Sequence, residues 1–212
     1  MIALVIVGNG RLDYLERTMQ SVWKAQCSWP QIMVDDSGDP DVTMHLHEEY
    51  PNCFHVTHTE NRGMAAAVQS GWGMALYLGA DHIIHLEDDM ELQAAPPIAA
   101  AIDALDANSH VAQMLFQRQP LTPAEHASGS VLGAMEVVAD HGDWSEQTSI
   151  FSLNPCVIPR RVLELGWPSG PLGVGNETGM TNKLRARGYT FGVWHGQYVE
   201  HIGETRGKAW QL

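Results

Sequence analysis

The sequence has few cysteines, few basic residues and no long apolar run. Its three cysteines, Cys27, Cys53 and Cys156, form no CxxC pair, so neither a disulfide framework nor a zinc–thiolate site is expected. No apolar stretch approaches the roughly 20 residues of a membrane helix. Residues 2–7 are apolar but lack a basic flank, which indicates a buried strand rather than a signal peptide. We therefore expect a cytoplasmic protein without a membrane span.

Basic residues are scarce overall and are unevenly placed. Lysine and arginine number 12 against 25 acidic residues, and the formal charge of −13 argues against non-specific binding to DNA or anionic membranes. Residues 1–159 carry 5 basic and 21 acidic residues, a net −16, whereas residues 160–212 carry 7 and 4, a net +3. If the C-terminal part folds back over the acidic part, an anionic ligand with a bound cation fits between them.

The chain does contain short apolar segments that alternate with helical patterns. Strands are expected near residues 2–7, 31–34, 54–57, 82–86, 111–116, 149–153 and 189–194. Helices are expected after residue 10, over 40–50, up to about 79, over 98–107, from 159 and over 177–187. A content of 44% hydrophobic and 17% charged residues is ordinary for a globular domain. This order predicts an α/β fold: one domain whose mainly parallel sheet is flanked by helices.

Several local signals refine these elements. Asp13 and Glu16 have the spacing of a capping box for the first helix, and Asp39 before Pro40 predicts a cap and a first helical residue. Gly71 and Gly73 lie inside the Ala-rich third helix, where each costs roughly 1 kcal/mol relative to alanine. We expect close backbone packing to explain both glycines. A Gly- and Pro-rich stretch over residues 166–175 is typical of a mobile loop.

The segment Ile83–Leu92, "IIHLEDDMEL", places Glu87, Asp88 and Asp89 directly after an apolar strand. Adjacent like charges raise one another's pKa, so such a cluster usually shares a cation or a proton. A solvated loop or a helix cap is the simpler explanation of an acidic run. The position favours a site, because polar clusters follow each of the first four strands and parallel strands end at the same ligand-binding edge. Carboxylate oxygens suit Mg²⁺ or Mn²⁺, which would bridge them to phosphate.

The order of motifs resembles the family 2 glycosyltransferases of the GT-A fold, most closely their short, bacteriophage-encoded members. The matching segments span roughly residues 2–203 and read "ALVIVGNGRLDYLERT", "MVDDSGD", "ENRGMAAAVQSGW", "LEDDM", "GNETGMTNKLRARGY" and "VEHIG". The resemblance implies a nucleotide-sugar-binding half over about residues 1–92, an acceptor-side half over about 93–203 and a tail over 204–212. It also implies a nucleoside-diphosphate-sugar donor, for which UDP-sugar is a family-level expectation.

The resemblance assigns roles to individual residues. The expected nucleotide and diphosphate contacts are Val7, Gly8, Asn9, Asp35, Asp36, Arg62, Asp88 and Arg206. Asp89 and His201 are the expected metal ligands, and Glu177 is the expected base that deprotonates the acceptor hydroxyl in an inverting transfer. Each residue type also has a structural use: acids in turns, a carboxylate at a helix N-terminus, a packed histidine, a solvated tail arginine. Trp167 and Trp194 fit sugar stacking and core packing equally.

The sequence departs from the family pattern at Glu87, where the first aspartate of the metal motif is expected, and at Asn176, where a glutamate is expected. These departures leave a non-catalytic nucleotide-sugar-binding module open. Nucleotidyl transfer to a sugar phosphate is the other alternative, although Gly8-Asn9-Gly10-Arg11 is a poor substitute for its glycine-rich triphosphate loop. The acceptor stays open between modified DNA, protein, glycan and small molecule.

Overall fold

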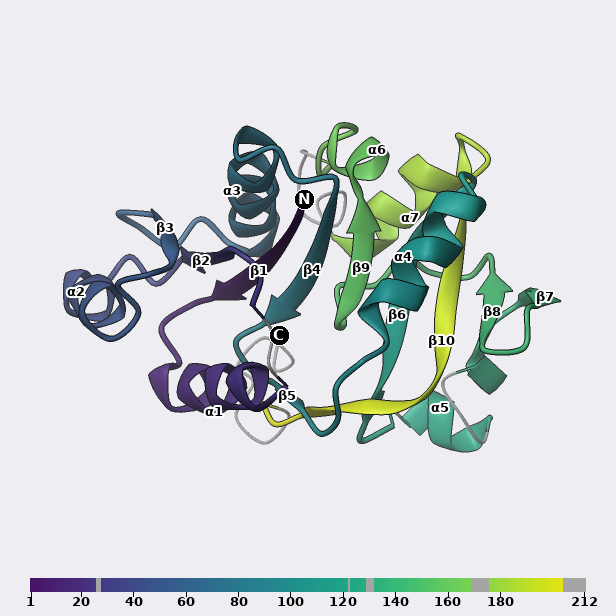
Figure 1. Ribbon diagram of the computed structural model, residues 1–212, viewed down its shortest axis with the longest axis horizontal. Helices are drawn as coiled ribbons and strands as arrows, with labels where there is room; N and C mark the ends of the chain where they lie inside the picture. Colours follow the sequence, from purple (N-terminus) through teal and green to yellow (C-terminus); the bar gives the residue numbers. More distant parts are fainter. Residues whose placement is uncertain (26–27, 122, 129–131, 169–175, 204–212) are drawn as a thin grey trace.

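One ten-stranded sheet organises the computed structural model (Figure 1). The structure describes residues 1–25, 28–121, 123–128, 132–168 and 176–203. The strands are β1 (Ile2–Gly8), β2 (Gln31–Asp35), β3 (Phe54–Thr57), β4 (His82–Glu87), β5 (Met90–Leu92), β6 (Val111–Gln119), β7 (Val137–Asp140), β8 (Trp144–Gln147), β9 (Cys156–Pro159) and β10 (Thr190–His201). The helices are α1 (Leu12–Lys24), α2 (Pro40–Glu49), α3 (Met64–Tyr77), α4 (Ile98–Ala107), α5 (Pro123–Ala127), the 3₁₀ turn η1 (Leu132–Ala134), α6 (Arg160–Leu163) and α7 (Glu177–Arg185).

The strand order is β3-β2-β1-β4-β9-β6-β10-β8-β7, which Figure 1 shows from left to right. Strands β3, β2, β1 and β4 are parallel. Strand β9 is antiparallel to both of its neighbours, β6 and β10 are parallel to each other, and β8 and β7 complete the mixed sheet. The chain leaves β1 to one side through β2 and β3 and returns to β4 on the other side. Open α/β sheets bind ligands at such a reversal of strand order.

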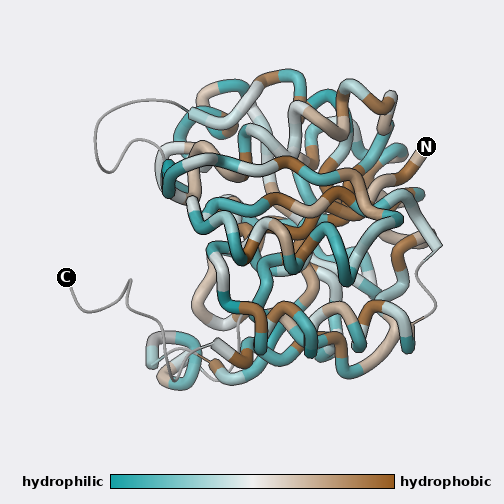
Figure 2. Tube along the Cα trace, turned by 90° about the vertical axis from the view of Figure 1, so that its left-hand side faces the viewer, coloured by the Kyte–Doolittle hydropathy of each residue, from teal (hydrophilic) through white to brown (hydrophobic). Residues whose placement is uncertain are grey.

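Helices cover both faces of the sheet, and each face has its own apolar core. Alternate residues of β1 point to opposite faces, with Val5 in one core and Leu4 in the other, as the two-residue period of a strand requires. Helices α3, α6 and α7 contribute to the first core, and α1, α2 and α4 contribute to the second. Figure 2 shows hydrophobic residues gathered in the interior of the molecule. The predicted α/β fold with a helix-flanked sheet is confirmed.

Several local expectations are wrong. Helix α1 begins at Leu12 with Arg11 as N-cap and no side-chain cap, so Asp13 lies inside the first turn and forms no capping box. Residues 149–153 are not a strand, because side chains rather than a neighbouring strand accept the N–H groups of Phe151 and Ser152. The Asp39 cap of α2 and Pro40 at its first turn are confirmed.

The two glycines of α3 differ. A Cβ at Gly71 would lie 2.7 Å from Val5 Cγ1 and 2.9 Å from Val34 Cγ2, so close packing against the sheet does require glycine there. A Cβ at Gly73 would meet no atom within 4 Å, so the packing explanation is wrong for Gly73.

The last strand is longer than expected, and its C-terminal end lies beside the acidic cluster. Beyond Trp194, β10 continues to His201 and pairs with β5, with His201 opposite Met90 and Val199 opposite Leu92 (Figure 1). This antiparallel ladder joins the chain just after the acidic cluster to the end of β10. None of the described helices is both long and apolar enough to cross a membrane.

Candidate active site at the acidic cluster

Strand β1, helix α1 and the turn between them place Asp88 at the reversal point of the sheet. The Asp88 N–H donates to Val7 O at the end of β1 (2.9 Å), and Thr18 Oγ1 of α1 donates to Asp88 O (2.8 Å). A Cβ at Gly8 would lie 3.0 Å from Asp88 Oδ2, so a larger residue there would press on the carboxylate. The N–H of Asn9 approaches the same oxygen at 3.4 Å. The predicted site residues Val7, Gly8, Asn9 and Asp88 therefore lie together.

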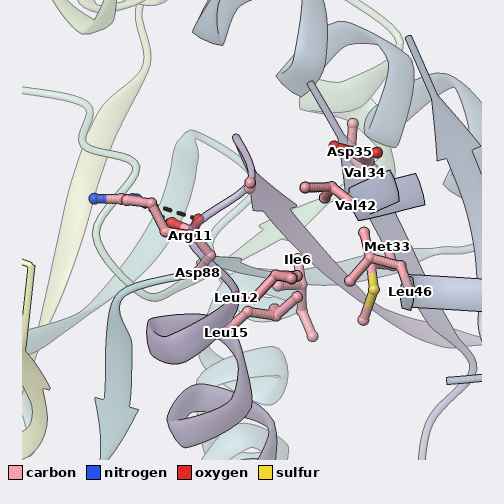
Figure 3. Close-up of a pocket in the computed structure, with 12 residues that line it drawn as sticks. Ile6, Arg11, Leu12, Leu15, Met33, Val34, Asp35, Val42, Leu46 and Asp88 are labelled. Carbon is pink, nitrogen blue, oxygen red and sulfur yellow. Dashed lines mark hydrogen bonds and ion pairs between the residues drawn. The ribbon is translucent and has the colours of Figure 1, made fainter. Parts of the chain in front are cut away.

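Arg11 binds both aspartates of the cluster. Its Nη1 donates to Asp89 Oδ2 (2.7 Å), its Nε donates to Asp88 Oδ2 (3.3 Å), and its Nη2 pairs with Asp88 Oδ1. Figure 3 shows the guanidinium beside Asp88, at a pocket whose other wall carries Asp35. Sequence reasoning missed this contact. The only signal for it is an arginine directly after the turn at the end of β1.

Asp89 is joined to the end of β10. Its backbone O accepts from Ile202 N (2.9 Å), and its Oδ2 lies 3.3 Å from His201 Nε2. Gly203 packs so closely that a Cβ there would lie 2.0 Å from Asp89 Oδ2. The two predicted metal ligands, far apart in the sequence, are therefore neighbours.

Electrostatic effects differ among the acids of the cluster. Burial raises the pKa of Asp88 to about 6, although its hydrogen bond and ion pair with Arg11 act in the opposite direction. Burial also raises the pKa of Glu87 to about 8, with the charges of Asp89 and Glu177 as further causes. Burial opposes ionisation of Asp89 too, but the hydrogen bond from His201 and the charge of Arg11 outweigh it and lower its pKa.

His201 shows the matching effect. Burial lowers its pKa, but the hydrogen bond to Asp89 and the negative charges of Asp89 and Glu87 outweigh burial, so the pKa is raised. The pair is therefore favoured as imidazolium and carboxylate. A bound divalent ion would reverse this preference, since it needs neutral imidazole.

The ligand chemistry at Asp89 fits a divalent cation. Carboxylate oxygen and imidazole nitrogen are both ligands of Mn²⁺, and Asp89 Oδ1 is buried without a hydrogen-bond partner within the described chain. Over the described ranges, no group of three or more His, Cys, Asp or Glu side chains has metal-binding spacing. Two protein ligands suffice where phosphate oxygens and water fill the remaining positions, as is usual for Mg²⁺ at phosphate sites.

Asp35 and Asp36 lie at the end of β2, and both are almost fully buried. Asp35 accepts from Ser37 N (2.9 Å) and from Thr43 Oγ1 (2.6 Å). Asp35 lines the pocket of Figure 3.

Asp36 organises the turn before α3. It accepts from the backbone N–H groups of Arg62 (2.9 Å) and Gly63 (2.8 Å), and His58 Nδ1 lies 2.7 Å from its Oδ1. The carboxylate thus holds the β3–α3 turn in place, while the Arg62 side chain is exposed to solvent.

Glu177 begins α7, whose N-cap is Asn176: the Asn176 Oδ1 accepts from Gly179 N at 3.0 Å. Ser152 Oγ donates to Glu177 Oε1 (3.0 Å), and Leu153 N donates to the same oxygen. The charge of Glu177 acts on Glu87, so both carboxylates belong to one electrostatic neighbourhood. No sequence motif predicted that Ser152 and Leu153 hold the Glu177 carboxylate.

Other predicted residues fall elsewhere. Arg206 lies outside the described residues, as does most of the 166–175 stretch. Trp167 and Trp194 are buried in the first and second cores respectively, which favours packing over sugar stacking. Glu91, two residues beyond the cluster, pairs with Arg17 (2.7 Å) rather than with the site.

No protein-family model matches the sequence, and no curated protein matches it. Solved structures do resemble the fold. The mannosyltransferase PcManGT from Pyrobaculum calidifontis, in complex with GDP-Man and Mn²⁺, superposes with a TM-score of 0.65 over 97% of this chain at 16% identity. GalNAc-T7 with UDP, GalNAc and Mn²⁺ gives a TM-score of 0.65 over 95% of this chain at 15% identity. This chain shares their GT-A-type fold and spans 58% and 44% of their lengths.

A nucleotide-activating enzyme has a related fold. CMP:2-keto-3-deoxy-manno-octonic acid synthetase, complexed with CTP, gives a TM-score of 0.61 at 11% identity. The superposition covers 94% of this chain and 91% of that chain. At such identities the likeness concerns the fold, and the chemistry must be argued from the residues.

Proposed function

We propose that this protein is a metal-dependent, inverting glycosyltransferase that moves a sugar from a nucleoside-diphosphate sugar to an acceptor hydroxyl. The observation that carries the proposal is the pairing of Asp89 with His201 beside Asp88 at the reversal point of the sheet. The nucleoside would lie toward Asp35 and the pocket of Figure 3, and the diphosphate would lie toward Asp89. The Mn²⁺ complexes among the structural relatives support this reading.

The chain's own residues supply three functions in this proposal. Asp89 and His201 would hold a divalent ion, which when bound neutralises the diphosphate and stabilises the departing phosphate. Asp88 would contact the ribose or the sugar. Glu177 would accept the proton of the acceptor hydroxyl as that oxygen attacks the anomeric carbon, and Ser152 and Leu153 aim its carboxylate by fixing Oε1.

Replacement of Glu177 tests the base. We expect Glu177→Gln to lower the rate of sugar transfer by a factor of about 10² to 10⁴ and to leave donor affinity unchanged, because the amide keeps the size but accepts no proton. Glu164→Gln, which removes an exposed carboxylate paired with Arg160, is the matched control. Intact transfer by Glu177→Gln would show that the base lies elsewhere.

A panel of nucleotide sugars tests the reaction class. The protein is incubated with each donor and Mn²⁺, or with a chelator, and released nucleotide is measured. Metal-dependent release of one nucleoside diphosphate supports transfer and identifies the donor, for which we expect UDP. Binding of a nucleotide sugar without any turnover would contradict the proposed enzymatic function and favour a non-catalytic binding module.

Nucleotidyl transfer is the second candidate, because the CTP-complexed synthetase matches this chain over nearly its whole length. Such an enzyme transfers the nucleoside monophosphate group of a nucleoside triphosphate to a sugar acid or sugar phosphate and releases pyrophosphate. The turn Gly8-Asn9-Gly10 offers little for a triphosphate, and its following Arg11 is bound to Asp88 and Asp89. Pyrophosphate release from CTP or UTP would favour this candidate.

Three points stay predictions from the sequence: membership of family 2, origin in a bacteriophage and the cytoplasmic location. The transferred sugar stays open between a hexose and a pentose. The division near residue 92 is also a prediction from the sequence, and the acceptor stays open.

A further inference from the structure

A positive group already lies on Asp89, the carboxylate that the proposed function gives to a divalent ion, and on its neighbour Asp88. The guanidinium of Arg11 pairs with Asp88 on one side and with Asp89 Oδ2 at 2.7 Å on the other. Both aspartates are almost fully buried, with exposures of 1% and 4%. Buried carboxylates without a counter-charge are strongly disfavoured, so Arg11 stabilises the cluster when no other cation is bound.

A divalent ion on Asp89 would meet Arg11 directly. Oxygen Oδ2 of Asp89 is shared, since it accepts from Arg11 Nη1 and also lies 3.3 Å from His201 Nε2. A cation coordinated by that carboxylate would lie within a few ångströms of the guanidinium, where like charges repel even at a high effective dielectric constant. The ion and Arg11 therefore compete for Asp89.

Arg11 has the freedom to leave. Arg11 is the N-cap residue of α1, so its side chain lies at the end of the helix. Its side chain is 31% exposed, far more than the aspartates it contacts. A diphosphate that arrives with the ion would give the guanidinium a new anionic partner, and phosphate oxygens suit its fork of donors well.

We propose that Arg11 is a displaceable counter-ion that couples metal binding to the arrival of a nucleoside diphosphate. This inference rests on the proposed function. Without diphosphate, Arg11 holds Asp88 and Asp89 and keeps the affinity for a free divalent ion low. With diphosphate and metal together, Arg11 gives up Asp89 to the ion and turns to the phosphate oxygens. The site is thereby loaded with metal and nucleotide jointly.

Binding of Mn²⁺ tests the competition without any turnover. Free Mn²⁺ is measured by electron paramagnetic resonance for the wild type, Arg11→Gln and Arg17→Gln, each alone and with UDP or GDP. We expect Arg11→Gln to bind Mn²⁺ alone at least about tenfold more tightly than the wild type, and the gain in affinity caused by the nucleotide to shrink. Arg17→Gln removes the same charge from α1, where the exposed Arg17 pairs with the half-buried Glu91, and should behave as the wild type.

Thermal unfolding gives a second measurement and shows whether each variant folds. In a chelator, Arg11→Gln should melt below the wild type because its aspartates have lost their counter-charge, and Mn²⁺ alone should raise its midpoint more than that of the wild type. Arg11→Lys keeps the charge but loses the two-sided contact, and should fall between them.

The outcomes separate the two proposals. If the wild type binds Mn²⁺ with UDP or GDP while Arg11→Gln binds Mn²⁺ alone no more tightly than the wild type does, the counter-ion role is overturned and the proposed function stands. If no sample binds Mn²⁺ with either nucleotide, the metal-dependent function itself is overturned, and the counter-ion role falls with it.

Discussion

At the scale of single residues, His85 is a neutral base held inside the sheet. It lies on β4, fully buried, and neither ring nitrogen has a hydrogen-bond partner in the described part of the chain. Burial lowers its pKa to about 4. Since the unfolded chain takes up this proton near pH 6.5 and the folded chain does not, the contribution of His85 destabilises the fold as the pH falls from about 6.5 to about 4.

We therefore expect His85→Leu to flatten the acid side of the stability profile. The difference between variant and wild type should grow by roughly 3 kcal/mol between pH 7 and pH 4, as follows from a pKa difference of about 2.5 units. Urea unfolding followed by circular dichroism at several pH values in this window measures it. Parallel curves for the two proteins would contradict the neutral state of His85.

At this scale the sequence predicted which residues lie at the site better than it predicted their contacts. Asp88, Asp89 and His201 were placed by motif, and the structure does bring them together. The pairing of Arg11 with Asp88 and Asp89 was missed, because a contact between residues so distant in the chain depends on the packing of α1 against β5 and the turn before it. Local sequence carries no information on that packing.

At the scale of elements, helix α3 contains a pair of glycines with opposite expected effects. Gly71→Ala should lower the free energy of unfolding by about 1–3 kcal/mol, because its Cβ would collide with Val5 and Val34 of the sheet. Gly73→Ala should raise it by about 0.5–1 kcal/mol, because the added methyl group meets nothing and alanine favours the helix. Denaturant unfolding of both variants measures the two free energies of unfolding, which can be compared if the m-values are equal. Equal effects would mean that α3 packs differently.

The elements that the sequence predicted well are those with local signals. Strands β1 to β4 contain short apolar runs. The start of α2 is predicted by Asp39 as the N-cap and Pro40 in the first turn. The strand expected at 149–153 is absent for a physical reason. Phe151 and Leu153 are buried, but the side chains of Thr181, Gln113 and Glu177 accept the N–H groups of the stretch. Apolar patterning predicts burial there and says nothing of which groups satisfy the backbone.

At the scale of the whole molecule, the charge of −13 makes unmodified DNA an unfavourable partner. Non-specific DNA-binding proteins neutralise several phosphates with basic residues and reach dissociation constants of roughly 10⁻⁴ to 10⁻⁶ M at physiological salt. We expect this protein to show no binding in that range, measured by fluorescence anisotropy with a labelled duplex at 150 mM salt. Binding that weakens steeply with added salt would contradict this and would bring a nucleic-acid acceptor forward.

The antiparallel ladder between β5 and β10 sets the order in which the site is completed. Because His201 reaches Asp89 only when Val199 and His201 pair with Leu92 and Met90, the site cannot close around a cation before β10 has been synthesised and has paired with β5. During that interval Arg11 is the positive group already available to the aspartates, since it lies on the N-terminal side of them. The same side chain that competes with the metal in the finished protein would then serve the growing chain as the partner that lets β4 pack before β10 exists.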